Sequence, residues 1–96
     1  MTWYALLHRP GPALDGVSVF EHPAFLEHVA FLRRLQADGM LVAAGPLPDE
    51  PGAGMTVVRV SDDVDVRALV ETDPSVAGGF LTVEVREWDV RFEGPA

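Results

Sequence analysis

The stretch from Pro23 to Gly39 reads PAFLEHVAFLRRLQADG and shows helical periodicity over its whole length. At about 100° of rotation per residue, four apolar side chains fall on one stripe: Phe25, Val29, Leu32 and Leu35. The opposite side faces water and carries Glu27, Ala30, Arg34 and Asp38. A proline in the first helical position and a glycine just past the last turn favour these two ends. The stretch therefore predicts one long amphipathic helix that packs against a sheet.

One polar residue, His28, lies inside the apolar stripe of this helix. A buried imidazole needs hydrogen-bond partners for its ring nitrogens. Such a histidine is typical of a satisfied core residue as well as of a catalytic site. No metal-ligating side chain stands three or four positions away on the helix, since positions 24, 25, 31 and 32 hold Ala, Phe, Phe and Leu. The pattern therefore predicts no metal site, and the partner of His28 must come from elsewhere in the chain.

Length and composition predict a single domain over residues 1–96. The 96 residues include 48% hydrophobic ones, enough for one modest core. No apolar run reaches the roughly 18–20 residues of a membrane span, and the chain begins without the basic segment of a secretory signal. There is no cysteine, hence no disulfide framework. We expect a cytoplasmic protein without membrane contact.

The charge balance argues against nucleic acid as a partner. Seven basic residues stand against fifteen acidic ones, which gives a net charge of −8. A phosphate backbone is repelled by such a surface, and no basic cluster offsets the repulsion.

The remaining segments predict a split β-α-β plan. Short apolar or alternating runs favour strands at 3–8, 40–45, 55–60 and 81–86, the second of them buried, and Asp62–Glu71 favours a second helix capped by Ser61 or Asp62. The order β-α-β-β-α-β is that of the ferredoxin-like fold, an α+β class with an antiparallel sheet. After Arg86 the apolar phase changes by one residue, which predicts a bulge or a further strand.

The first strand predicts a partner for the sheet. Its two faces are both largely apolar, with Trp3, Ala5 and Leu7 on one and Tyr4, Leu6 and His8 on the other. Two helices cover only one face of a four-stranded sheet, and the other would stay apolar and wet in a monomer. We therefore expect a homodimer, or a larger oligomer, joined through the helix-free face. The segment from Trp88 to Phe92 would pack on the mate or on the rim of the joint barrel.

Among the acidic residues, Asp73 is placed best to meet His28. It stands where the second helix ends, directly before Pro74. In the split plan both helices lie on one sheet face, so this carboxylate can reach the inner edge of the first helix. A His–Asp pair would fix the imidazole tautomer, as a general base requires. The alternative is a turn residue that bonds only its own backbone.

The other polar candidates carry weaker signals. His8 ends the first strand, a position that borders a cleft in many folds, or is simply a strand-end residue. His22, beside Pro23, reads as a structural residue at the helix start. The serines at 18, 61 and 75 lie in no nucleophile-elbow pattern, and no glycine-rich phosphate loop is present.

Several short elements, in order, resemble one family. They are His28, Gly39, Ala44-Gly45-Pro46, Asp73-Pro74 and Val76-Ala77-Gly78. Together they resemble the YCII-related (YciI-like) proteins over nearly the whole chain. The resemblance implies a ferredoxin-like fold that dimerises as an α+β barrel, with a cleft in which His28 and Asp73 form an acid–base site. It also implies a relation to muconolactone-isomerase-type and dehydrochlorinase-type enzymes.

Residues and resemblance together predict a small cofactor-free enzyme. It would carry out proton transfer, isomerisation or elimination on a small cyclic or phenolic compound. His28 would be the base or acid and Asp73 its orienter, with His8 and Ser75 as contacts to the substrate. The alternative is a non-catalytic dimeric module that binds a metabolite or a partner, with the pair as structural polar contacts. Whether His28 borders an open cavity or is sealed helps to separate the two.

Overall fold

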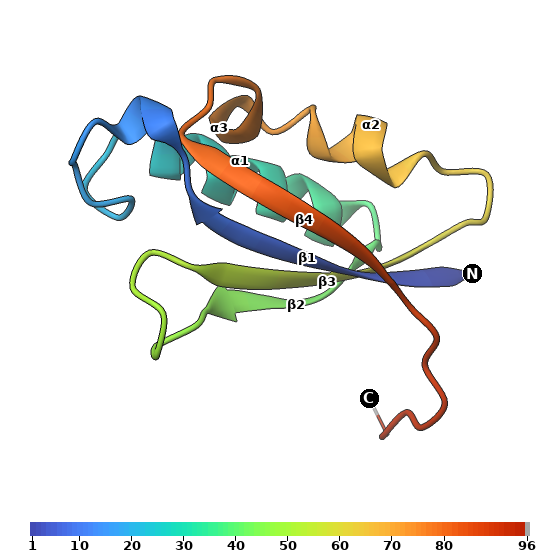
Figure 1. Ribbon diagram of the computed structural model, residues 1–96. Helices are drawn as coiled ribbons and strands as arrows, with labels where there is room; N and C mark the ends of the chain where they lie inside the picture. Colours follow the sequence, from blue (N-terminus) through green and yellow to red (C-terminus); the bar gives the residue numbers. More distant parts are fainter. Residues whose placement is uncertain (96) are drawn as a thin grey trace.

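The computed structural model describes residues 1–95 and shows a four-stranded sheet with helices along one side (Figure 1). The strands are β1 (Thr2–Pro10), β2 (Leu41–Pro46), β3 (Gly54–Val60) and β4 (Leu81–Trp88). They pair in the order β2-β3-β1-β4, and every pairing is antiparallel. The helices are α1 (Ala24–Ala37), α2 (Val66–Val70) and α3 (Pro74–Ala77), and a 3₁₀ turn, η1 (Pro12–Leu14), follows β1. This is the predicted ferredoxin-like α+β fold.

Helix α1 ends as its sequence predicts. Gly39 adopts a left-handed φ of 75°, and the Met40 amide donates to the Leu35 carbonyl at 3.0 Å, which closes the last turn. The buried stripe is Ala24, His28, Phe31 and Leu35. It is rotated from the expected one, because Phe31 occupies its centre whereas Val29 is only half-buried.

The core lies between α1, α2 and the sheet face that carries Leu6. Its buried members are Leu6, Phe31, Leu35, Val58, Val60, Val66 and Val70. Since side chains alternate along a strand, His8, two residues after Leu6, lies on the same face of β1. The histidine therefore lies at the end of the core, next to the start of α1 and the β2–β3 loop.

The second helical region differs from the prediction of one helix over Asp62–Glu71. Helix α2 spans only Val66–Val70, and its cap is Asp65, whose carboxylate accepts from the Ala68 amide at 3.1 Å. The chain then forms α3 directly after Asp73, where a strand lead-in was expected. A proline can follow the end of one helix and also occupy the first position of the next. Pro74 does both, since it comes after α2 and begins α3.

Strand β2 is an edge strand, not the buried strand expected from its apolar run. It pairs only with β3, and nearly all its residues are exposed. A short apolar run does not reveal which place in the sheet it takes. The register of β2 slips between Leu41 and Ala43, so a bulge occurs here.

The predicted bulge after Arg86 is absent. The β1–β4 register runs without a break from Pro10↔Leu81 to Trp3↔Trp88. The apolar pattern changes because the last apolar residue of β4, Trp88, points to the helix-free face, whereas Leu81, Val83 and Val85 point to the helices. The Trp88 ring lies edge-on to that of Trp3, with centroids 6.0 Å apart. Residues 89–95 form neither helix nor strand, and Phe92 is 97% exposed.

The helix-free face is apolar over its centre, as expected. Alternation along β1 and β3 assigns it Trp3, Ala5, Leu7, Met55 and Val57, with Arg59 toward one end of β3. Strand β4 adds Trp88, and its Thr82, Glu84 and Arg86 make that edge of the face polar. Among the described residues, no helix is long and apolar enough to cross a membrane.

Candidate active site

His28 and Asp73 meet in the interior between α1 and α3. Nδ1 of His28 lies 2.6 Å from Oδ2 of Asp73, and both side chains are buried. The contact joins positions that are 45 residues apart. It forms because the helical period turns His28 inward and because Asp73 stands at the start of α3, the element beside α1.

The second oxygen of Asp73 holds its own backbone. Oδ1 accepts from the Ser75 amide at 2.9 Å and from the Ser75 hydroxyl at 2.6 Å. Burial on its own raises the pKa of Asp73, but the hydrogen bonds from His28 and Ser75 outweigh it, and the net pKa lies below the usual value. Asp73 is thus an ionised acceptor that both caps α3 and pairs with His28.

This pairing fixes which ring nitrogen of His28 is free. An ionised carboxylate only accepts hydrogen bonds, so Nδ1 of His28 carries a proton. In the neutral imidazole Nε2 is then left as a lone-pair acceptor. That is the arrangement of a general base oriented by a third group.

A second imidazole, His8, lies against the first. The two ring centroids are 4.7 Å apart with an interplanar angle of 64°. Nε2 of His8 is 3.1 Å from Oγ1 of Thr56, whereas Nδ1 is buried and has no partner within residues 1–95. Burial first, and then the charge of His28, lower the pKa of His8 to about 4, against a smaller opposing effect of Asp73. His8 is therefore uncharged near neutral pH.

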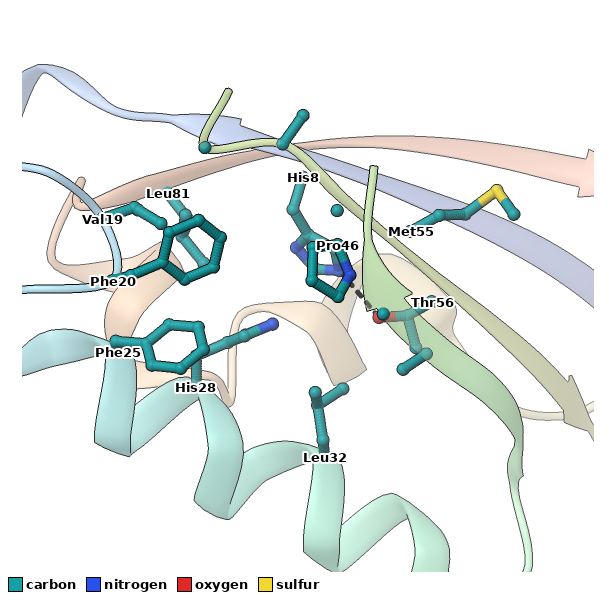
Figure 2. Close-up of a pocket in the computed structure, with 15 residues that line it drawn as sticks. His8, Val19, Phe20, Phe25, His28, Leu32, Pro46, Met55, Thr56 and Leu81 are labelled. Atoms are coloured by element: carbon teal, nitrogen blue, oxygen red, sulfur yellow. Dashed lines mark hydrogen bonds between the residues drawn. The ribbon is translucent and has the colours of Figure 1, made fainter. Parts of the chain in front are cut away.

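Both histidines line a half-open cavity of about 80 Å³ (Figure 2). Figure 2 shows the His8 imidazole, which hangs from the sheet, next to the His28 imidazole on α1, with the aromatic rings of Phe20 and Phe25 to one side of the two. The walls are formed by His8, Val19, Phe20, Phe25, His28, Leu32, Ala44, Gly45, Pro46, Gly52, Ala53, Gly54, Met55, Thr56 and Leu81. Only His8, His28 and Thr56 bring side-chain nitrogen or oxygen atoms to it, and none of the lining residues is Lys, Arg, Asp or Glu.

The remaining predicted residues lie elsewhere. Ser75, expected as a substrate contact, is buried behind Asp73 and does not line this cavity. His22 is structural as expected: its Nδ1 accepts from the Ala24 amide at 3.0 Å at the start of α1. Within residues 1–95, no group of three or more metal-ligating side chains comes together.

The sequence did not indicate Thr56, Phe20 or Phe25 as parts of this site. Thr56 carried one signal, because it is the one polar residue on the side of β3 that faces the core, where the register sets it opposite Leu6. Phe20 comes from the segment between η1 and α1, whose path no periodicity predicts.

Comparison with known proteins places the chain among relatives and fold neighbours. The model of the YCII-related domain matches residues 2–89. The uncharacterized protein YjpA of Bacillus subtilis (strain 168) is 35% identical over 69 residues, which cover 68% of this chain and 80% of that protein.

Among solved structures, 5-chloro-2-hydroxyhydroquinone dehydrochlorinase (TftG) from Burkholderia phenoliruptrix AC1100, in complex with 2,5-dihydroxybenzoquinone, shares the fold. Its TM-score is 0.62 at 20% identity, with 90% of this chain and 93% of that chain covered. At this identity the likeness shows the fold alone. The match over residues 2–89 shows more: this chain belongs to the YCII-related domain family.

Proposed function

We propose that this protein is a small acid–base enzyme in which His28 moves a proton on a cyclic or phenolic compound, by isomerisation or elimination. The observation that carries the proposal is the buried His28–Asp73 pair, with a contact of 2.6 Å, at the wall of a half-open cavity. A histidine that served only packing would not need to border a hollow lined by apolar and aromatic groups.

The chemistry follows from the orientation of the ring. Nε2 of His28 takes a proton from a carbon or oxygen of the substrate, and the electron pair of the broken bond stays on the substrate. Asp73 keeps the proton on Nδ1 and stabilises the imidazolium that forms. The proton then returns at another position in an isomerisation, or a leaving group departs with its electron pair in an elimination. This sequence of steps requires no cofactor.

The apolar and aromatic lining of the cavity supports a small ring compound. An apolar cavity of about 150 Å³ holds benzene, so the 80 Å³ of this cavity would take only part of such a ring, and the rest would extend through its open side. The fold neighbour from Burkholderia phenoliruptrix was solved with a six-membered ring compound, 2,5-dihydroxybenzoquinone. This likeness supports the same substrate class here.

The test is solvent exchange catalysed by the protein. A panel of cyclic ketones and phenols is incubated in D₂O with the wild type, with His28→Gln and with His22→Gln, and deuterium uptake is followed by NMR. The proposal expects uptake into one substrate class with the wild type and with His22→Gln, and its loss with His28→Gln. Compounds that bind in the cavity without any catalysed exchange or turnover would favour the non-catalytic binding module.

We also propose that two copies join through the helix-free face. The support is the apolar centre of that face and the half-exposed Trp88 at its rim. The tail after β4 would then contact the mate, which would cover Phe92. A stable contact of this kind buries on the order of 2,000 Å² in total.

A further inference from the structure

The proposed proton transfer by His28 leaves two polar side chains of the cavity unused, Thr56 and His8. His8 is the one with an unpaired atom. It is 3% exposed, and its Nδ1 is the only side-chain nitrogen or oxygen within residues 1–95 that is both fully buried and unpaired. An unsatisfied buried polar atom costs about 1–3 kcal/mol, so its presence calls for an explanation. The ring lines the cavity, which is where a bound molecule would supply the missing partner.

Thr56 determines what this nitrogen can offer. The Thr56 hydroxyl bonds Nε2 of His8 at 3.1 Å, and a hydroxyl can donate as well as accept. When the hydroxyl donates, Nε2 is the acceptor and the single proton of the neutral ring is on Nδ1. Figure 2 draws this second nitrogen on the side of the ring away from Thr56, toward Phe20 and Phe25.

The two histidines then present complementary groups to one molecule. His28 offers a lone pair on Nε2, since its Nδ1 is bound to Asp73, and His8 offers an N–H donor on Nδ1. The ring centroids are 4.7 Å apart, so the two groups can address neighbouring atoms of one small ring.

We propose that His8 is a second catalytic residue, whose Nδ1–H binds the substrate oxygen on which negative charge develops while His28 removes the proton. In the step, a C–H bond next to a carbonyl breaks, a bond from the hydrogen to Nε2 of His28 forms, and the electron pair moves onto the oxygen as an enolate. His8 keeps its proton throughout and donates a hydrogen bond. An uncharged imidazole is known to act as such an electrophile in triosephosphate isomerase.

This assignment rests on the proposed function and narrows its substrate class. The molecule carries a carbonyl, enol or phenol oxygen next to the reacting atom. It carries no carboxylate or phosphate inside the cavity, because no lining side chain is a cation that could balance such a group. A donor aimed at the developing charge in a water-poor site stabilises the transition state more than the ground state.

A spectroscopic probe tests the role of His8 without knowledge of the natural substrate. 4-Nitrophenol is an aromatic oxygen acid whose phenolate absorbs at a wavelength different from the phenol, and 4-nitrobenzoate is the carboxylate control. With ¹⁵N-histidine protein, the ring nitrogens of His8 report the tautomer. We expect the neutral phenol to bind and to give its proton to Nε2 of His28, so that the phenolate forms together with its counter-ion. We expect the His8 proton to be on Nδ1 and the signals of both cavity histidines to move, whereas 4-nitrobenzoate, which brings a charge and no proton, moves neither.

Variants then separate a ligand contact from a packing role. The double variant His8→Phe/Thr56→Val replaces both partners of the buried contact by apolar groups, so we expect it to fold. We expect it to bind 4-nitrophenol about tenfold more weakly, the effect of one lost hydrogen bond. His8→Asn, whose amide branches from the same carbon as Nδ1, should recover part of that loss, and His22→Gln should bind as the wild type does.

Other outcomes overturn specific parts of the reasoning. If the probe moves the His28 signals but leaves His8 unchanged, or if the double variant binds as tightly as the wild type, the assignment of His8 is wrong and the proposed function stands. A His8 proton that stays on Nε2 in the complex overturns the assignment in the same way. If the probe moves the signals of neither histidine, the proposed function falls, and the role of His8 falls with it.

Discussion

Replacing His8 should change how the stability of the fold depends on pH. Burial and the neighbouring His28 lower the pKa of His8 from 6.5 to about 4, while Asp73 opposes them weakly. Between these two pH values the unfolded chain binds a proton at this position and the folded chain does not. Stability therefore falls as the pH decreases from 6.5 to about 4, and the contribution of His8 is fully present above 6.5.

The size of the effect follows from the shift. One pKa unit corresponds to about 1.4 kcal/mol, so a lowering from 6.5 to about 4 corresponds to roughly 3 kcal/mol of unfolding free energy. That is a large share of the 5–15 kcal/mol typical of a small domain. The double variant His8→Phe/Thr56→Val has no such proton to bind. Its stability should therefore fall by about 3 kcal/mol less than that of the wild type over this range.

Urea unfolding at several pH values measures the difference, with the fluorescence of Trp3 and Trp88 as the signal. His22→Gln is the control, because His22 is a histidine outside the cavity. Subtracting the curve of the double variant from that of the wild type cancels the groups that titrate alike in both proteins. Equal pH dependence of the two proteins between pH 4 and 6.5 would show that His8 is not buried as an uncharged group.

Three further predictions concern the pair, the dimer and the tail. Asp73→Asn should lower the unfolding free energy by about 1–3 kcal/mol in chemical denaturation, because it weakens three hydrogen bonds to a buried side chain. Ser75→Ala, which removes one of them, should lower it by about 1 kcal/mol. Unchanged stability in both variants would contradict the hydrogen bonds between Asp73, His28 and Ser75. Sedimentation should show a dimer at micromolar concentration, and Trp88→Glu should shift it toward monomer; a wild-type monomer refutes the interface. Hydrogen exchange across 88–92 should be slower in the wild-type dimer than in that variant, and equal rates would show that the tail makes no contact with the mate.

The elements with strong periodicity could be predicted, and so could the pair that they carry. The period of helix α1 points His28 inward whatever surrounds it, and the proline after Asp73 fixes a helix boundary at that carboxylate. Both signals depend only on neighbouring residues, and the ferredoxin-like order of elements brings His28 and Asp73 together. The shift of the buried stripe toward Phe31 came from how α1 rotates on the sheet, which is a matter of packing.

The family resemblance implied a cleft at His28, but most of the residues that line it could not be predicted, because the lining depends on how segments far apart in the sequence pack together. Thr56 and His8 meet through the register of β1 and β3, and Phe20 reaches the mouth along a segment with no period. The position of β2 at the edge of the sheet could not be predicted either. A short apolar run fits an edge strand as well as a central strand.

The two interpretations of Asp73, a turn residue and a partner of His28, turned out to be compatible. A carboxylate has two oxygens: Oδ1 serves Ser75 at the start of α3, and Oδ2 serves His28 on α1. Because the first set of bonds holds the carboxylate still, the imidazole is oriented by the end of a helix and not by a mobile side chain. Rigid support of this sort is what a general base needs, since its lone pair must be aimed at one atom of the substrate. It also means that substitutions of Asp73 disturb the α3 cap and the site together, whereas substitutions of His28 leave the bonds from Oδ1 to Ser75 in place.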